Sequence, residues 1–157
     1  MPQNRAWARL RSVPPTADLE RMLRGVGLRV TRPRRAVLAA VHGNPHADTE
    51  SLIAAVRRDS GWVSHQAVYD VLGALTAAGL VRRFQPTGSV ARYEARVGDN
   101  HHHLVCRACG AITDVDCAIG AAPCLTPAED NGYEVGEAEV IYWGRCPECA
   151  AGAAATG

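Results

Sequence analysis

Residues 101–109 read HHHLVCRAC and residues 146–149 read CPEC, so a histidine triplet is followed by two Cys-x-x-Cys pairs. Two such pairs bring four thiolates into the tetrahedral arrangement that Zn²⁺ prefers, and a site closed by four thiolates is structural. The motif therefore predicts a structural zinc in a small domain in the second half of the chain. A redox-active dithiol is the alternative. The four cysteines of the predicted site are Cys106, Cys109, Cys146 and Cys149.

The histidine triplet offers a second and harder set of ligands beside the zinc site. On a strand, His101 and His103 point to one face and His102 points to the other. Glu94 lies seven residues before His101, and Asp114 lies eleven residues after His103. Either carboxylate can add an oxygen ligand, or can be an ordinary surface hydrogen-bonding group. Mixed nitrogen and oxygen ligands suit Fe(II), Mn(II) or Zn(II), and a metal held in this way would allow the chain to act as a sensor.

Two cysteines, Cys117 and Cys124, are left over. They can be small buried hydrophobic residues, or they can form a redox-responsive thiol pair. Both interpretations stay open.

Charge is divided unequally along the 157 residues. Residues 1–92 contain 14 arginines against six acidic residues, a net charge of +8, whereas residues 93–157 contain three arginines against ten, a net charge of −7. A basic first half indicates a polyanionic partner. No apolar run reaches membrane-spanning length, and cysteines without a secretory signal are typical of a cytoplasmic protein. We expect neither a membrane nor a small-molecule substrate as partner.

The first half of the chain has the pattern of helices followed by a β-hairpin. Residues 80–84 and 90–94 read as strands joined around Gly88, and Gly79 is expected to end the last helix in a left-handed conformation. Capping residues and apolar stripes mark the helix starts. The predicted helices begin at Asp18, Thr31, Asp48 and Ser64. Helices followed by a two-stranded wing predict a winged helix-turn-helix domain.

The helix that follows Ser64 is the candidate DNA reader. Its apolar residues share one face, and Gln66, Tyr69 and Gly73 lie on the other. Gln66 can bond to base edges, and the Tyr69 ring can contact a thymine methyl group. The alternatives are solvated helix faces or a protein-interaction module. The arginines suited to phosphate contacts are Arg32, Arg34 and Arg35 in the second helix and Arg82 and Arg83 at the wing.

The second half reads as a small α/β unit that follows a linker. Short strands are expected at 103–105 and 111–115, a short helix from Thr126, and a buried strand at 137–143. So few apolar residues cannot form a large core, which predicts burial against a second copy in a homodimer. The expected fold class is α+β. The expected divisions are a flexible tail at 1–16, a winged-helix domain at 17–95, a metal-binding dimerisation domain at 96–149 and a flexible tail at 150–157.

In combination, these motifs resemble those of the ferric uptake regulator (Fur) family. The resemblance covers about residues 17–149 and implies a dimeric, metal-responsive repressor of double-stranded operator DNA. It implies a winged helix followed by an α/β dimerisation domain with a zinc ion held by four cysteines. The motifs are GLRVTRPR at 27–34, AVY at 67–69, AGLV at 78–81, HHHLVCRACG at 101–110 and CPEC at 146–149.

The resemblance also implies the ligands of a regulatory metal, with Fe(II) expected and Mn(II) or Zn(II) as alternatives. The acidic ligand at 114 is Asp in peroxide-sensing members and Glu in iron-uptake members, and this chain has Asp. A further family site does not carry over, since its positions fall at Asn100, His102, Ala121 and Ala138. Asp70 stands where the family pattern has Arg. The implied regulatory ligands are His46, Glu94, His101, His103 and Asp114.

Within the family, the chain is most similar to the actinobacterial FurA branch. The stretches QAVYDVL at 66–72, GSVARYEAR at 88–96 and VGDNHHH at 97–103 carry that similarity. It implies repression of a neighbouring catalase-peroxidase gene and of the regulator's own gene, with a response to peroxide. A zinc- or nickel-responsive regulator of metal uptake is the alternative within the family. A zinc hydrolase that uses the histidine cluster, or a zinc-ribbon scaffold, are alternatives from other classes.

Overall fold

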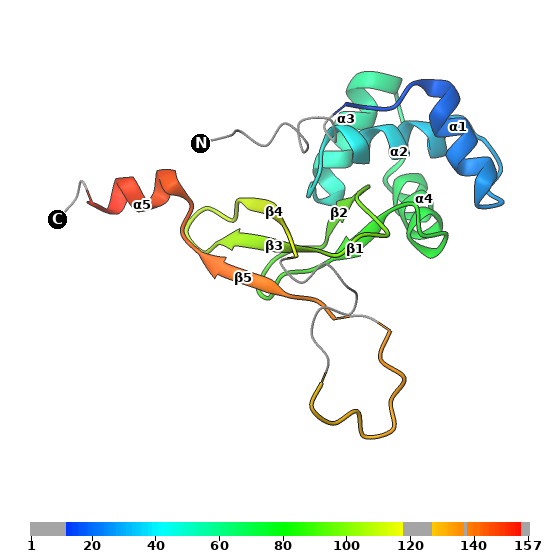
Figure 1. Cartoon of the computed structure of the whole chain (residues 1–157). Helices are drawn as coiled ribbons and strands as arrows, with labels where there is room; N and C mark the ends of the chain where they lie inside the picture. The colour runs from blue at the N-terminus through cyan, green and yellow to red at the C-terminus, as the bar shows by residue number, and fades with distance from the viewer. Residues whose placement is uncertain (1–11, 118–126, 137, 155–157) are drawn as a thin grey trace. The chain divides into compact units, whose positions relative to one another are not determined.

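Two compact units make up the chain, Met1–Val97 and Gly98–Gly157. The structure is a computed structural model that describes residues 12–117, 127–136 and 138–154 (Figure 1). Most of the expected N-terminal tail therefore lies outside the described residues. Among the described residues, no helix is long and apolar enough to span a membrane.

Side-chain caps determine where the helices of the first unit begin. The side chains of Thr31, Asp48 and Ser64 accept hydrogen bonds from the backbone N–H groups three residues further on, at 3.4, 2.8 and 3.2 Å. Each cap satisfies a helix N–H group that has no partner within the helix. These three predicted starts are confirmed, whereas the first helix begins at Thr16 and not at the predicted Asp18. The helices are α1 (Thr16–Gly25), α2 (Arg32–Gly43), α3 (Thr49–Ser60) and α4 (His65–Ala77).

Helix α4 presents one apolar face and one polar face, as its sequence predicts. Val68, Leu72 and Leu75 are buried in the core formed with α1, α2 and α3, whereas Gln66 and Tyr69 are exposed. Burying a Leu side chain stabilises the fold by about 1.5–3 kcal/mol. The helix stops because Gly79 adopts a φ of +72°, and the Leu80 N–H then bonds to the Leu75 carbonyl at 3.0 Å.

The wing is a short antiparallel hairpin of β1 (Arg82–Phe84) and β2 (Arg92–Glu94). Both strands are shorter than the predicted ones. An isolated bridge between Ala47 and Tyr93 adds a third segment beside β2, which periodicity did not predict. The bridge connects the segment before α3 to the hairpin.

The second unit contains β3 (His101–Cys106), β4 (Ile112–Asp116), β5 (Ile141–Gly144) and α5 (Pro147–Ala154). Among the described residues, β3 lies at the centre of the sheet, antiparallel to β4 and parallel to β5 (Figure 1). The register pairs His103 with Asp114 across β3 and β4, and it brings Cys106 beside Gly144 at the end of β5.

Three expectations for the second unit are wrong or fall outside the described residues. Strand β5 begins only at Ile141, four residues after the expected start, and within this single chain its Tyr142 is 49% exposed. Residues 150–154, expected as a flexible tail, belong to α5, whose alanine-rich sequence favours a helix and which starts at Pro147. Thr126 is not described, and residues 127–136 contain no helix.

Candidate metal centres and nucleic-acid interface

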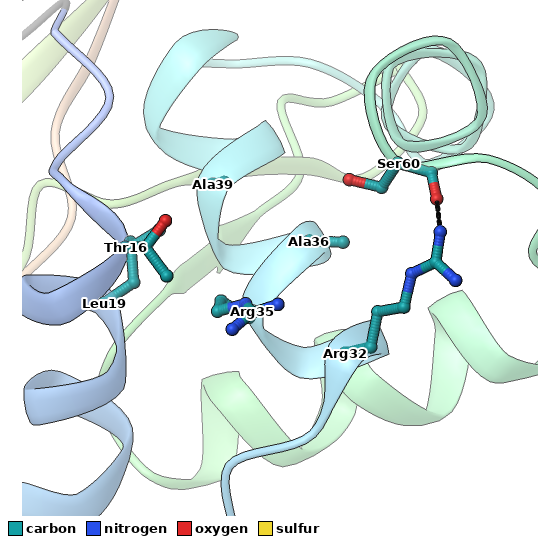
Figure 2. Close-up of a pocket in the computed structure, with 7 residues that line it drawn as sticks. All are labelled: Thr16, Leu19, Arg32, Arg35, Ala36, Ala39 and Ser60. Carbon is teal, nitrogen blue, oxygen red and sulfur yellow. Dashed lines mark hydrogen bonds between the residues drawn. The ribbon is translucent and has the colours of Figure 1, made fainter.

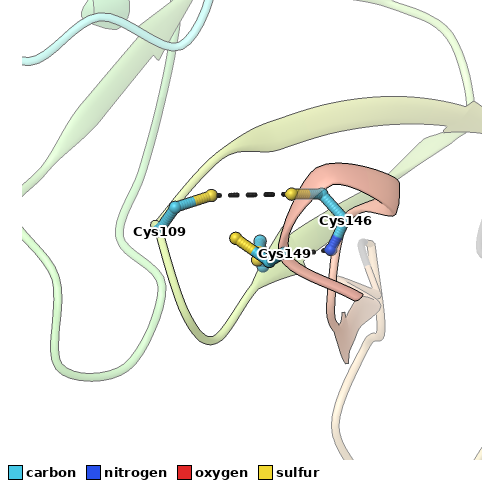
Figure 3. Close-up of side chains that lie close together, drawn as sticks. Cys109, Cys146 and Cys149 are labelled. Atoms are coloured by element: carbon cyan, nitrogen blue, oxygen red, sulfur yellow. Dashed lines mark hydrogen bonds between the residues drawn. The ribbon is translucent and has the colours of Figure 1, made fainter. Parts of the chain in front are cut away.

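The second unit brings the two Cys-x-x-Cys pairs together. Cys106 ends β3 and Cys109 follows in the loop to β4, while Cys146 directly precedes α5 and Cys149 lies in its first turn. Parallel pairing of β3 with β5 delivers both pairs to the same end of the sheet. The four sulfur atoms lie within 4.8 Å of one another, and Figure 3 shows the labelled side chains converging.

The spacing and the ionisation of these thiols fit a zinc ion. Tetrahedral bonds of about 2.3 Å place neighbouring sulfurs about 3.8 Å apart, and the Sγ atoms of Cys109 and Cys146 are 3.7 Å apart. The backbone N–H of Cys146 donates to the Cys106 Sγ at 3.3 Å and, with the N–H of Cys109, lowers the pKa of Cys106 to about 6. Hydrogen bonds with Cys146 and Cys109 raise the pKa of Cys149 to about 12. All four cysteines can therefore be ionised together only when a cation neutralises their negative charge.

The leftover cysteines do not form a described pair. Cys117 follows β4, is half-buried, and its N–H donates to the Asn100 carbonyl at 3.1 Å. Cys124 lies outside the described residues, so the redox-pair hypothesis stays a prediction.

In the first unit, backbone pairing brings His46 to the hairpin. The His46 N–H donates to the Tyr93 carbonyl at 2.9 Å, and the Tyr93 N–H donates to the Ala47 carbonyl at 3.0 Å. His46 has a φ of +62°, a left-handed conformation that is uncommon outside glycine. Such an outlier persists only where the surrounding structure holds it, and it is often found at a functional site.

The His46 side chain lies beside a carboxylate as a result. Its Nε2 is 3.3 Å from the Glu94 Oε2, and its ring packs edge-on against Phe84 with centroids 5.9 Å apart. Arg82 was expected to contact DNA phosphates. Its Nη1 instead lies 3.9 Å from the other oxygen of the Glu94 carboxylate. We call His46 and Glu94 the first histidine–carboxylate pair.

In the second unit, strand alternation places the histidines as predicted. The His103 Nε2 is 3.7 Å from the Asp114 Oδ1, and the rings of His101 and His103 lie 5.2 Å apart. His102 instead lies beside Tyr142, with ring centroids 6.1 Å apart. We call His103 and Asp114 the second histidine–carboxylate pair.

Sequence reasoning missed a partner of His101. The Nδ1 of His101 is 2.7 Å from the Asp99 Oδ1. A carboxylate on one ring nitrogen fixes the orientation of the imidazole and leaves the other nitrogen for a metal. The sequence feature that could have indicated this contact is the acidic residue two positions before His101.

The predicted DNA-reading residues lie on the exposed face of α4 and on the wing. Tyr69 is 49% exposed, and the exposed Gln66 Nε2 donates to the Asp70 Oδ1 at 2.7 Å. Arg83 is exposed, and its guanidinium donates to the Gln85 side chain at 3.1 Å. Arg82 and Arg83 alternate along β1, so only Arg83 points away from Glu94.

The arginines of α2 have partners within the first unit. Arg32 donates to the carbonyl of Ser60 across a shallow pocket of about 330 Å³ between α1, α2 and the end of α3 (Figure 2). Arg34 donates to the Arg29 carbonyl at 2.9 Å, and Arg35 donates to Glu20 at 2.8 Å. Hydrogen bonds from Arg35 and Arg24 lower the pKa of Glu20. Arg32 and Arg35 therefore connect α2 to the neighbouring helices as well as carrying positive charge.

Comparison with known protein sequences finds one matching family model. The model described as "Ferric uptake regulator family" matches residues 25–142. The chain is 67% identical over 132 residues to the transcriptional regulator FurA of Mycobacterium tuberculosis, covering 84% of this chain and 90% of that one. It is 68% identical over 137 residues to ferric uptake regulation protein 2 of Mycolicibacterium fortuitum, covering 85% and 94%.

Solved structures share the fold. The ferric uptake regulator of Vibrio cholerae aligns with a TM-score of 0.63 at 24% identity, covering 81% of this chain and 98% of that one. A structure of the Pseudomonas aeruginosa ferric uptake regulator with manganese aligns with a TM-score of 0.61 at 26% identity, covering 82% and 98%. These similarities confirm the expected α+β fold with an N-terminal winged helix and a C-terminal domain.

Proposed function

Because this chain belongs to the ferric uptake regulator family, we propose that it represses transcription by binding operator DNA as a metal-loaded homodimer. The relatives also confirm the actinobacterial FurA branch. The chain is a metal-dependent transcription regulator and not an enzyme, so the zinc hydrolase alternative is wrong.

The observation that carries the proposal is that each unit holds a largely buried histidine–carboxylate pair at ligand spacing, His46 with Glu94 and His103 with Asp114. Metal–ligand bonds of about 2.1 Å, at the angles of about 90–120° between neighbouring ligands of a five-coordinate ion, separate two ligand atoms by about 3.0–3.6 Å. The nitrogen–oxygen distances are 3.3 Å for His46 and Glu94 and 3.7 Å for His103 and Asp114. The donor sets therefore fit one ion of the Fe(II), Mn(II) or Zn(II) class.

We assign both pairs to one regulatory metal, with His101 as the fifth ligand. Two ligands alone hold a metal weakly, and a single ion shared by both pairs would link the two units. The metal supplies this link when it is bound, and the protein supplies ligands on both sides of the boundary at Val97 and Gly98. The contact between Asp99 and the His101 Nδ1 orients the imidazole and leaves its Nε2 for the metal.

Regulation follows from this link. In a dimer, the angle between the units sets the separation of the two α4 helices, which must match DNA half-sites about 34–36 Å apart or a related geometry. Metal loss would release that angle and lower the fraction of dimers able to bind DNA. A coupling of about 1–3 kcal/mol is enough to change occupancy about 5- to 150-fold.

We propose Fe(II) as the physiological metal and peroxide as the signal that removes repression. Asp114 is the acidic residue found in peroxide-sensing members, and the FurA similarity supports control of a catalase-peroxidase gene and of the regulator's own gene. Peroxide would act by oxidising Fe(II), its histidine ligands or a thiol. Mn(II) or Zn(II) at the same ligands would give a regulator without this response.

The four-cysteine site would hold a structural zinc that stabilises the dimer. Leu104 and Tyr142 are cross-strand partners on one face of the second unit's sheet and are 43% and 49% exposed. An exposed apolar pair on a small sheet supports burial against a second copy.

The test is binding of labelled DNA from upstream of the protein's own gene, with a shuffled duplex as control. The purified zinc-containing protein is titrated with Fe(II), Mn(II), Zn(II) or Ni(II) without oxygen, and peroxide is then added. We expect Fe(II)-dependent operator binding that peroxide reverses. Binding with only Zn(II) or only Ni(II) would favour the alternative regulators, and full binding without added metal would contradict the proposal.

A further inference from the structure

Gln66 and Asp70 lie one turn apart on the exposed face of α4. The Gln66 amide nitrogen donates to the Asp70 carboxylate at 2.7 Å. Among the described residues, Gln66 is the only recorded partner of Asp70, so no arginine or lysine neutralises this carboxylate.

Asp70 is the only acidic residue of α4. It stands in a half of the chain with a net charge of +8, on the face that would contact DNA. A carboxylate in this position repels phosphates, so its presence weakens binding to DNA in general. The charge therefore needs an explanation other than affinity.

The hydrogen bond determines which way the Gln66 amide points. A carboxylate only accepts hydrogen bonds, so it selects the orientation in which the amide nitrogen faces Asp70. One of the two N–H groups of the amide lies on the same edge as its carbonyl oxygen. When the other N–H bonds to Asp70, that edge offers a donor and an acceptor side by side.

This pair of groups matches adenine in the major groove. Adenine presents the N7 acceptor beside the N6 amino donor, and glutamine can bond to both at once. Gln66 lies at the N-terminal end of α4, the end of a recognition helix that contacts base edges.

We propose that Asp70 is a positioning and specificity-determining residue, which holds Gln66 in the orientation that reads an adenine and weakens binding to DNA without that base. The proposal rests on the proposed function, in that α4 enters the major groove of an operator. It goes beyond that function by assigning a base and a pair of residues that recognise it.

The first experiment selects binding sites from a random duplex library with the full-length, metal-loaded protein. Wild type, Gln66→Ala, Asp70→Ala and the double variant are compared. We expect an adenine position that is enriched by wild type and lost in all three variants. If every adenine position that wild type enriches survives in Gln66→Ala, the proposal is overturned. If wild type selects no sequence at all, the proposed function itself fails.

The second experiment replaces that adenine with 7-deazaadenine, which removes only the N7 acceptor. Wild-type affinity should fall about 5- to 100-fold. For Asp70→Ala the loss should be threefold or less, while affinity for random DNA rises. In a protein that already carries Gln66→Ala, adding Asp70→Ala should not change the ratio of affinities for the adenine and 7-deazaadenine duplexes, because Asp70 acts on this ratio through Gln66.

A matched charge control is Asp18→Ala, since Asp18 is an exposed acid on α1 paired with Arg21. It changes the net charge equally, and adenine discrimination should stay at the wild-type value. If Asp70→Ala still loses as much affinity for the 7-deazaadenine duplex as wild type does, the hydrogen bond between Gln66 and Asp70 is only a surface contact and the proposal is overturned. Thermal melting of each variant confirms that α4 remains folded.

Discussion

The backbone N–H of His46 donates to the carbonyl of Tyr93 at 2.9 Å, which places the His46 imidazole beside the neighbouring Glu94. This contact joins a residue before α3 to the wing and holds His46 at a φ of +62°. The left-handed conformation suits Asn but costs an Ala residue about 1–2 kcal/mol.

We therefore expect His46→Asn to lose metal-dependent operator binding while keeping the wild-type melting temperature. The metal concentration for half-maximal binding should rise by roughly tenfold or more. His46→Ala should show the same loss and also melt at a lower temperature. Metal titrations followed by DNA anisotropy, with calorimetry, measure both effects. The control is His102→Asn, a histidine that lies beside Tyr142 and outside the proposed ligand set, and an equal loss in this variant would refute a ligand role for His46.

The histidine triplet should behave asymmetrically. His101→Ala should abolish metal-dependent operator binding and leave the zinc content unchanged, because the ring of His101 lies near His103 and Asp99. His102→Ala should be mild, because His102 lies on the opposite face beside Tyr142. Operator binding and metal analysis of both variants decide the matter. The assignment would be wrong if His102→Ala were the more damaging change.

The four-cysteine site should couple zinc to assembly. Cys106→Ser or Cys149→Ser should lose tightly bound zinc and the dimer together, since metal-binding energy in a small site is also folding energy. Zinc analysis and light scattering measure the two losses, and Cys117→Ser is the control. A stable dimer with one zinc ion per chain in either variant would contradict the structural role.

The same site should lose zinc in acid. The pKa of Cys106 is lowered to about 6 by the N–H groups of Cys146 and Cys109, so its thiolate is present above that pH and is protonated below it. Zinc affinity should therefore fall as the pH decreases, and more steeply below about pH 6. A competition titration with a zinc-binding dye at several pH values measures this.

Two substitutions should separate base contacts from phosphate contacts. Tyr69→Ala should weaken operator binding more than random-DNA binding, by about 5- to 100-fold if the ring contacts a base. Arg83→Ala should weaken both DNAs alike and reduce the salt slope by about one. Anisotropy titrations at several salt concentrations distinguish the two cases. Equal losses on both DNAs for Tyr69→Ala would exclude base readout by this ring.

Acid should also destabilise the first unit through His42. Burial lowers the pKa of His42 below its usual 6.5, so the unfolded chain takes up a proton that the folded chain resists. The free energy of unfolding should then decrease as the pH falls below about 6.5, and the decrease should end below the folded pKa. Denaturant unfolding between pH 8 and pH 5 measures this slope, which His42→Leu should flatten and His65→Leu should not.

Local features of this protein follow from the sequence alone. The caps at Thr31 and Ser64 and the left-handed Gly79 depend on contacts within a few residues, and all three are confirmed. Strand alternation in the same way separates His102 from its two neighbours. Two Cys-x-x-Cys pairs predicted one sulfur cluster because a closed zinc site needs four ligands, although it is the pairing of β3 with β5 that brings the two pairs together.

Tertiary structure decided the contacts between distant segments. The bridge from Ala47 to Tyr93 brings His46 to Glu94, and no local periodicity encodes that register. The family resemblance named both residues, but only the fold supplies the physical reason for their proximity. The start of β5 at Ile141 and its parallel pairing with β3 were likewise decided by which strands meet, because the same apolar pattern suits more than one position in a sheet.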